Sequence, residues 1–100
     1  ILLHAMTSCW LSDPGYVAYF TIYRDSTNIA PDNNGFANMY QSGASGVDLL
    51  THLNMSYLDS PNTTSAITYQ IYARNNSTSV TNNWSQNGST SVIIAMEIAG

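Results

Sequence analysis

Apolar and polar residues alternate along much of this chain with a period of two, which is the period of a β-strand. The clearest case is residues 47–59, "VDLLTHLNMSYLD". One face of this segment is apolar apart from Thr51 and carries Val47, Leu49, Leu53, Met55 and Tyr57. The other face carries Asp48, His52, Asn54 and Ser56, interrupted only by Leu50 and Leu58. The pattern predicts a strand with one dry face.

Further strands are predicted where apolar, aromatic and β-branched residues gather between polar turns. These segments are 1–10, 16–24, 66–74 and 91–99, with a sixth, short strand at 78–81 in the polar loop 75–90. Turns are predicted at 12–16, 24–28 and 59–62, the last around Pro61. Residues 29–46 form a long irregular connection that contains a tight turn at 32–35. Six short strands without a helix predict one all-β domain over residues 1–100, an antiparallel β-sandwich.

The same alternation predicts which side chains form the core. The apolar faces of the last three long strands place the following residues inside: Leu49, Leu53, Met55, Tyr69, Ile71, Val92, Ile94 and Met96.

Charge is scarce, at 8% of residues against about 25% in ordinary domains. The polar surface must therefore come from Ser, Thr, Asn and Gln. This composition suits extracellular or virion proteins that function within an assembly. The net charge of −4 with two basic residues argues against nucleic-acid binding and against adhesion to anionic membrane.

The cysteine content, the hydropathy and the start of the chain add three expectations. Cys9 is the single cysteine, so no intrachain disulfide can form. No apolar run approaches the roughly 20 residues of a membrane-spanning helix, so we expect no membrane insertion. The chain opens at Ile1 directly in an apolar strand, from which we expect further polypeptide upstream.

Three stretches together resemble a known family: "FTIYRDSTNI" (20–29), "SYLDSPNTTSAITYQIYARN" (56–75) and "STSVIIAMEI" (89–98). They are similar to a C-terminal domain of structural and fibre proteins in marine phages, notably cyanophages, and in some large algal viruses. The resemblance covers the chain from about residue 16 onward. The final "AG" extends past the family's usual terminal "MEI".

This resemblance implies a jelly-roll-like head of the tumour-necrosis-factor and complement type, assembled as a homotrimer on the virion exterior. The implied function is that of a fibre tip or capsid-surface decoration that contacts other virion proteins and the host surface. Two alternatives remain open: a capsid-cementing protein without a receptor, and a secreted lectin-like or complement-type head.

Exposed aromatic residues among amides are the best ligand candidates, because sugar CH faces pack on rings while amides bond hydroxyl groups. On this basis we predict contact with a host-surface glycan, at Trp84, Asn83, Gln86, Asn87 and Tyr40. The alternative for Trp84 is a structural plug at one end of the sandwich. Seven tyrosines exceed the needs of one small core, which predicts an oligomer interface at Tyr16, Tyr19, Phe20 and Tyr72.

No catalytic residue, metal ligand or cofactor is predicted. His4 and His52 fit no metal spacing, and zinc requires three or four nitrogen or sulfur ligands. Residues 32–35 are rich in oxygen ligands but lack the later bidentate Glu of a calcium loop, so a turn is the better interpretation. "SGASG" (42–46) has no following helix and is not a nucleophile elbow. The Asn-x-Ser/Thr triplets arise by composition.

Overall fold

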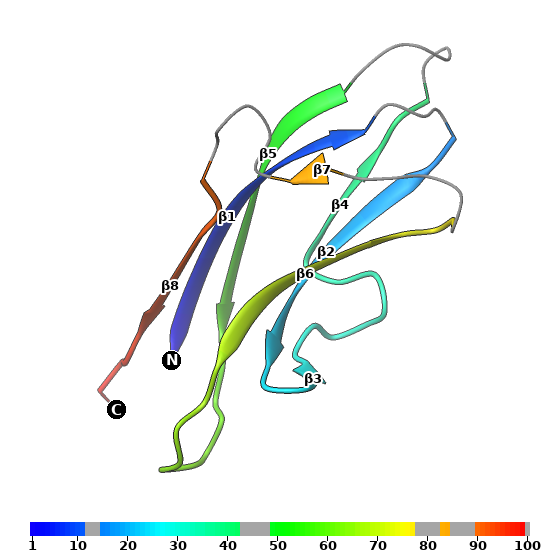
Figure 1. Ribbon diagram of the computed structural model, residues 1–100. Coiled ribbons are helices and arrows are strands. Elements are labelled where there is room, and N and C mark those ends of the chain that lie inside the picture. Colours follow the sequence, from blue (N-terminus) through cyan, green and yellow to red (C-terminus); the bar gives the residue numbers. More distant parts are fainter. Residues whose placement is uncertain (12–14, 43–48, 78–82, 85–89, 100) are drawn as a thin grey trace.

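The chain folds as an antiparallel β-sandwich, as its sequence pattern predicts. The structure is a computed structural model that describes residues 1–11, 15–42, 49–77, 83–84 and 90–99. Within these residues all regular structure is strand (Figure 1). Sheet A contains β1 (Leu2–Leu11), β5 (Leu49–Leu58), β7 (Asn83–Trp84) and β8 (Val92–Met96). Sheet B contains β2 (Val17–Arg24), β3 (Thr27–Asn28), β4 (Ala37–Tyr40) and β6 (Tyr69–Asn75).

Each sheet is organised around one central strand. In sheet A, β1 pairs with β5 along one edge and with β8 and β7 along the other. In sheet B, β2 pairs with β6 along one edge and with β3 and β4 along the other. All of these pairs are antiparallel, and β4 faces β5 while β6 faces β8 across the sandwich. The chain changes sheet between β1 and β2, β4 and β5, β5 and β6, and β6 and β7, which is a jelly-roll type of connectivity.

The core lies between the two central strands. Leu3, Ala5 and Leu11 of β1 face Ala18, Phe20 and Ile22 of β2, and all six are 0–1% exposed. Cys9, Met39 and Met55 complete this buried set. Of the predicted core residues, Met55 is buried, and Leu49, Leu53, Tyr69 and Ile71 pack against the buried set. The predicted inner faces of β5 and β6 are therefore confirmed for these residues. Tyr57, predicted on the same face of β5, is 36% exposed, and Val47 lies outside the described residues.

The predicted inner face of the last strand is wrong. Val92, Ile94 and Met96 are 37%, 43% and 47% exposed, and Ile93 packs against the core instead. The physical reason is register: β8 pairs with β1 so that Ile93 lies opposite the buried Ala5. Because β8 is apolar on both faces, its own alternation does not choose between them.

The connections agree with the turn signals only in part. Residues 29–46, predicted as one irregular connection, contain β4, a four-residue strand that pairs with the start of β2. The turn at 32–35 is present: the backbone N–H of Asn34 donates to Oδ1 of Asp32 at 2.8 Å. The short strand predicted at 78–81 lies outside the described residues.

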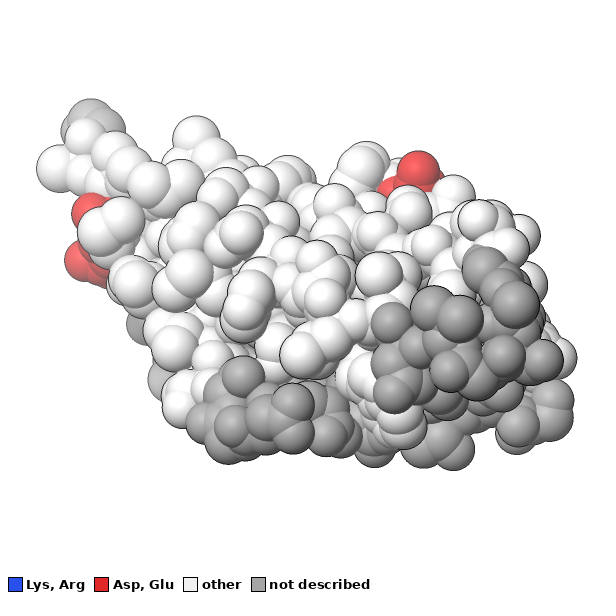
Figure 2. Space-filling model, turned by 90° about the horizontal axis from the view of Figure 1, so that it is seen from above, with Lys and Arg blue, Asp and Glu red and all other residues white. Residues whose placement is uncertain are grey.

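Charged side chains are sparse on the face of the molecule seen from above. The described part of this face is almost uniformly uncharged, and acidic side chains appear at two separate places (Figure 2). The described residues contain no helix long and apolar enough to cross a lipid bilayer.

Candidate functional site

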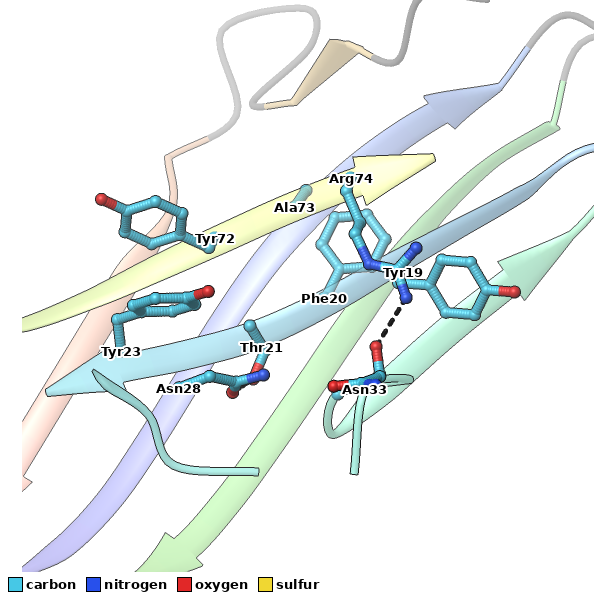
Figure 3. Close-up of a pocket in the computed structure, with 10 residues that line it drawn as sticks. Tyr19, Phe20, Thr21, Tyr23, Asn28, Asn33, Tyr72, Ala73 and Arg74 are labelled. Atoms are coloured by element: carbon cyan, nitrogen blue, oxygen red, sulfur yellow. Dashed lines mark hydrogen bonds between the residues drawn. The ribbon is translucent and has the colours of Figure 1, made fainter. Parts of the chain in front are cut away.

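A shallow groove lies on the outer face of sheet B, away from the core (Figure 3). Its volume is about 150 Å³, and it runs along β2 and β6 beneath the loop that follows β3. Its lining is largely aromatic and polar: Tyr19, Phe20, Thr21, Tyr23, Asn28, Asn33, Gly35, Tyr72, Ala73 and Arg74. We call this feature the tyrosine groove.

The register between β2 and β6 brings the tyrosine rings of the groove and the Arg74 guanidinium together. Tyr19 pairs directly with Arg74, and directly opposed residues on one sheet face lie within side-chain contact. The Arg74 guanidinium carbon accordingly lies 4.3 Å from the centroid of the Tyr19 ring, a cation–π contact. Tyr72 lies diagonal to Tyr23, and their rings stack with centroids 4.3 Å apart.

The loop after β3 closes one side of the groove. The carbonyl oxygen of Asn33 accepts a 2.6 Å hydrogen bond from Nη2 of Arg74. The Oδ1 atom of Asn28 accepts hydrogen bonds from Oγ1 of Thr21 and from the backbone N–H of Ala30. The side-chain NH₂ of Asn28 therefore remains as a donor toward the groove.

Gly35 lets this loop approach β2 closely. Its φ is +77°, and a Cβ at this position would overlap the carbonyl oxygen of Phe20. That carbonyl accepts the backbone N–H of Phe36 at 2.9 Å. Only glycine allows both the left-handed backbone and the close approach.

A second polar cluster joins the "FTIYRDSTNI" stretch to the "SYLDSPNTTSAITYQIYARN" stretch. Arg24, at the end of β2, forms an ion pair with Asp59, which directly follows β5. The Asp59 carboxylate also accepts a 2.7 Å hydrogen bond from the hydroxyl of Tyr69. Burial, with this hydrogen bond and the adjacent carboxylate charge, raises the pKa of Tyr69 to about 12.

The turn residues of the same two stretches also interlock. Asp25 has a φ of +53° in the two-residue loop between β2 and β3, a conformation that Asp tolerates. Its backbone N–H donates to the carbonyl of Thr68, and its Oδ1 accepts the backbone N–H of Thr68. These motif residues hold one end of the sandwich together, so their chemistry is structural.

The outer face of sheet A carries a group of exposed apolar side chains. Leu2 of β1 lies between Leu58 of β5 and Met96 of β8, and the next outward positions add His4, Ile94 and Ser56. Met6 and Val92 follow in the third row, together with the polar Asn54 of β5. We call Leu2, Met6, Leu58, Val92, Ile94 and Met96 the apolar face of sheet A. Leu58 is the most exposed of them at 60%, and none of the rows contains Lys, Arg, Asp or Glu.

The predicted ligand residues do not form one described site. Trp84 and Asn83 form β7, whose backbone pairs with Cys9 and Trp10, but their side chains lie outside the described part. Gln86 and Asn87 also lie outside it. Tyr40 is 56% exposed on β4 and does not line the tyrosine groove.

The predicted interface residues divide between surface and core. The prediction for Phe20 is wrong, because Phe20 is 1% exposed and its side chain belongs to the core. Tyr72 is 45% exposed, and Tyr16 and Tyr19 are half-buried. Sequence reasoning singled out Tyr19 and Tyr72 as interface residues and missed the groove, although the aromatic positions on one face of residues 16–24 were a usable signal.

The titratable residues considered at the sequence level do not converge. His4 hydrogen-bonds Ser56 through Nδ1 at 2.8 Å, while His52 pairs opposite Ser8, four positions farther along β1. Among the described residues no three His, Cys, Asp or Glu side chains gather closely enough to hold a metal ion. Cys9 is buried, and burial raises the pKa of its thiol to about 11, which keeps the thiol protonated at neutral pH.

Comparison with known proteins gives no match: neither the family models, nor the curated proteins, nor the solved structures contain one that is significantly similar to this chain. The resemblance to viral head domains therefore remains a prediction.

Proposed function

We propose that this domain is a structural head on the exterior of a virus particle, assembled as a homotrimer, which also contacts the host surface. The observation that carries the proposal is the apolar face of sheet A. A continuous group of exposed Leu, Ile, Val and Met side chains on a folded domain is typical of a surface covered by another protein.

The character of this face favours a second copy of the chain as its cover. Its rows contain no Lys, Arg, Asp or Glu, so identical copies meet there without like-charge repulsion. In a trimer the three faces pack around the common axis, and stable interfaces of this kind bury at least about 1,200 Å² in total. Ile98, 58% exposed just beyond β8, extends the same surface.

The resemblance to marine viral heads supports a location on a virus particle. The scarcity of charged residues supports a protein that functions within an assembly. The motif residues Arg24, Asp25 and Asp59 are engaged in hydrogen bonds that hold the fold. This use of the carboxylates favours a structural and binding role over catalysis.

The assembly part is tested by measuring the mass of the purified domain with light scattering at micromolar concentration. We expect a trimer that Ile94→Lys converts to a monomer and that Tyr72→Ala leaves intact. Loss of the trimer on Tyr72→Ala alone would place the interface on sheet B, and a monomer at every concentration would refute the assembly.

The virion part is tested by mass spectrometry of marine samples separated into cells and density-purified virus particles. We expect peptides of this chain to be enriched in the particles. Absence of these peptides from the purified particles would refute the virion part.

A further inference from the structure

The two basic side chains of this protein have different surroundings. Arg24 is neutralised by Asp59, with Nη1 2.9 Å from Oδ1 and 3.0 Å from Oδ2. Arg74 is exposed in the tyrosine groove, and among the described residues no carboxylate lies within ion-pair distance of it. The chain contains no other Lys or Arg to serve such a role. A groove cation that no described carboxylate neutralises is suited to an anionic ligand.

The contacts of Arg74 hold its side chain in place but use only part of its hydrogen-bonding capacity. Its guanidinium lies over the Tyr19 ring and donates one hydrogen bond, from Nη2 to the carbonyl of Asn33. A guanidinium carries five N–H donors in a planar fork that matches a carboxylate. Several donors therefore remain for a ligand, in an orientation fixed by the ring and the loop.

The rest of the groove suits a sugar ring. Tyr23 and Tyr72 stack on each other, and Tyr72 remains 45% exposed, so its ring offers a surface for sugar CH groups (Figure 3). The Asn28 NH₂ and the tyrosine hydroxyls supply hydrogen bonds to sugar hydroxyl groups. A volume of about 150 Å³ is below the 300–1,000 Å³ of drug-sized pockets, which limits the occupant to about one residue of a longer glycan.

We propose that the tyrosine groove binds one acidic sugar residue, a uronic-acid type of glycan unit, with its ring against Tyr72 and its carboxylate at Arg74. This inference rests on the host-contact part of the proposed function and specifies its ligand. It does not depend on the assembly part, because all groove residues come from one copy of the chain.

The test is a titration of the isotopically labelled domain followed by NMR, with three probes: methyl glucuronoside, methyl glucoside and acetate. We expect methyl glucuronoside to shift groove resonances and to bind about two- to five-fold more tightly than methyl glucoside, the range of an exposed charge contact. We expect the difference to shrink with added salt because Arg74 is exposed. Acetate alone should shift the groove far less.

Variants separate the roles of charge and ring. Arg74→Gln should lower the affinity for methyl glucuronoside to that for methyl glucoside, while Arg74→Lys should keep part of the preference. Tyr72→Ala should weaken binding of both sugars. Tyr40→Ala distinguishes the groove from the sugar contact predicted at Tyr40, since Tyr40 is an exposed tyrosine of the same sheet that lies outside the groove; if the groove binds the sugar, Tyr40→Ala should change neither affinity. Dispersed amide spectra verify that each variant is folded.

The outcomes distinguish this inference from the proposed function. Equal affinity for the two sugars refutes the acidic-sugar inference and leaves host contact through a neutral glycan standing. Acetate binding as tightly as the glucuronoside indicates a simple anion site and also refutes it. Equal losses from Tyr40→Ala and Tyr72→Ala place the site elsewhere and refute the inference. Failure of both sugars to bind also refutes it and leaves host contact through residues outside the groove standing. None of these results changes the trimer measurement.

Discussion

Arg24 and Asp59 are separated by 35 residues in sequence and form an ion pair with Nη1 2.9 Å from Oδ1. The pair joins the end of β2 in sheet B to the end of β5 in sheet A. The Asp59 side chain is 7% exposed and that of Arg24 is 27% exposed, so the carboxylate is the more desolvated partner. The backbones of Asp59 and Ile1 also exchange two hydrogen bonds, which continue the β1–β5 ladder.

Replacing Asp59 by Asn should destabilise the domain, because Arg24 and the Tyr69 hydroxyl lose their charged acceptor. We expect a loss of about 1–3 kcal/mol in the free energy of unfolding, measured by urea denaturation. A double-mutant cycle with Arg24→Gln isolates the ion pair and should give a coupling energy of at least about 0.5 kcal/mol. Additive losses would show that the two side chains do not interact in solution.

Gly35→Ala should destabilise the domain more than Gly15→Ala does. Both glycines have positive φ, +77° and +82°, so both substitutions strain the backbone by about 1 kcal/mol or more. A Cβ at Gly35 would also overlap the Phe20 carbonyl, whereas nothing lies within 4 Å of one at Gly15. Thermal unfolding of the two variants compares them directly. Equal shifts of the midpoint would mean that the loop does not lie against β2.

Stability should fall as the pH rises from about 9 to 12. The pKa of Cys9 is raised from 9.0 to about 11 by burial, and that of Tyr69 from 10.0 to about 12. A raised pKa means that the folded state favours the neutral group. The stabilisation is therefore complete below the ordinary pKa and is lost as the pH rises through the folded one.

The thermal unfolding midpoint measured against pH tests this expectation. Cys9→Ala should remove the part of the decline that begins near pH 9. Tyr69→Phe should remove the part that begins near pH 10. An unchanged alkaline profile in both variants would contradict these two assignments.

Truncation of the neighbouring isoleucines on β8 should change stability by different amounts. Ile93 packs against the core, so Ile93→Ala should cost about 2 kcal/mol, the low end for a partly buried isoleucine. Ile94 is 43% exposed, so Ile94→Ala should change the stability of the isolated fold by less than about 0.5 kcal/mol. Chemical denaturation under conditions that keep the chain monomeric measures both. The reverse order would mean that β8 presents the other face to the core.

The sequence by itself determines the strands and their turns to a large extent. Period-two alternation identifies β5 and β6 and their inner faces, because each has one polar face that must meet solvent. The turn at 32–35 follows from local backbone chemistry, in which Asp32 bonds a nearby amide and Gly35 accepts positive φ. Such features depend only on residues close in the chain.

Only the tertiary structure decides the features that depend on pairing between distant segments. The apolar strand β8 has no polar face, so its orientation comes from its register with β1, which exposes Ile94. The tyrosine groove exists because the register of β2 with β6 places Arg74 beside Tyr19. Asp59 occurs in a turn-like sequence, and its ion pair with Arg24 forms only when the two sheets meet, since local propensity carries no information about contacts across a sandwich.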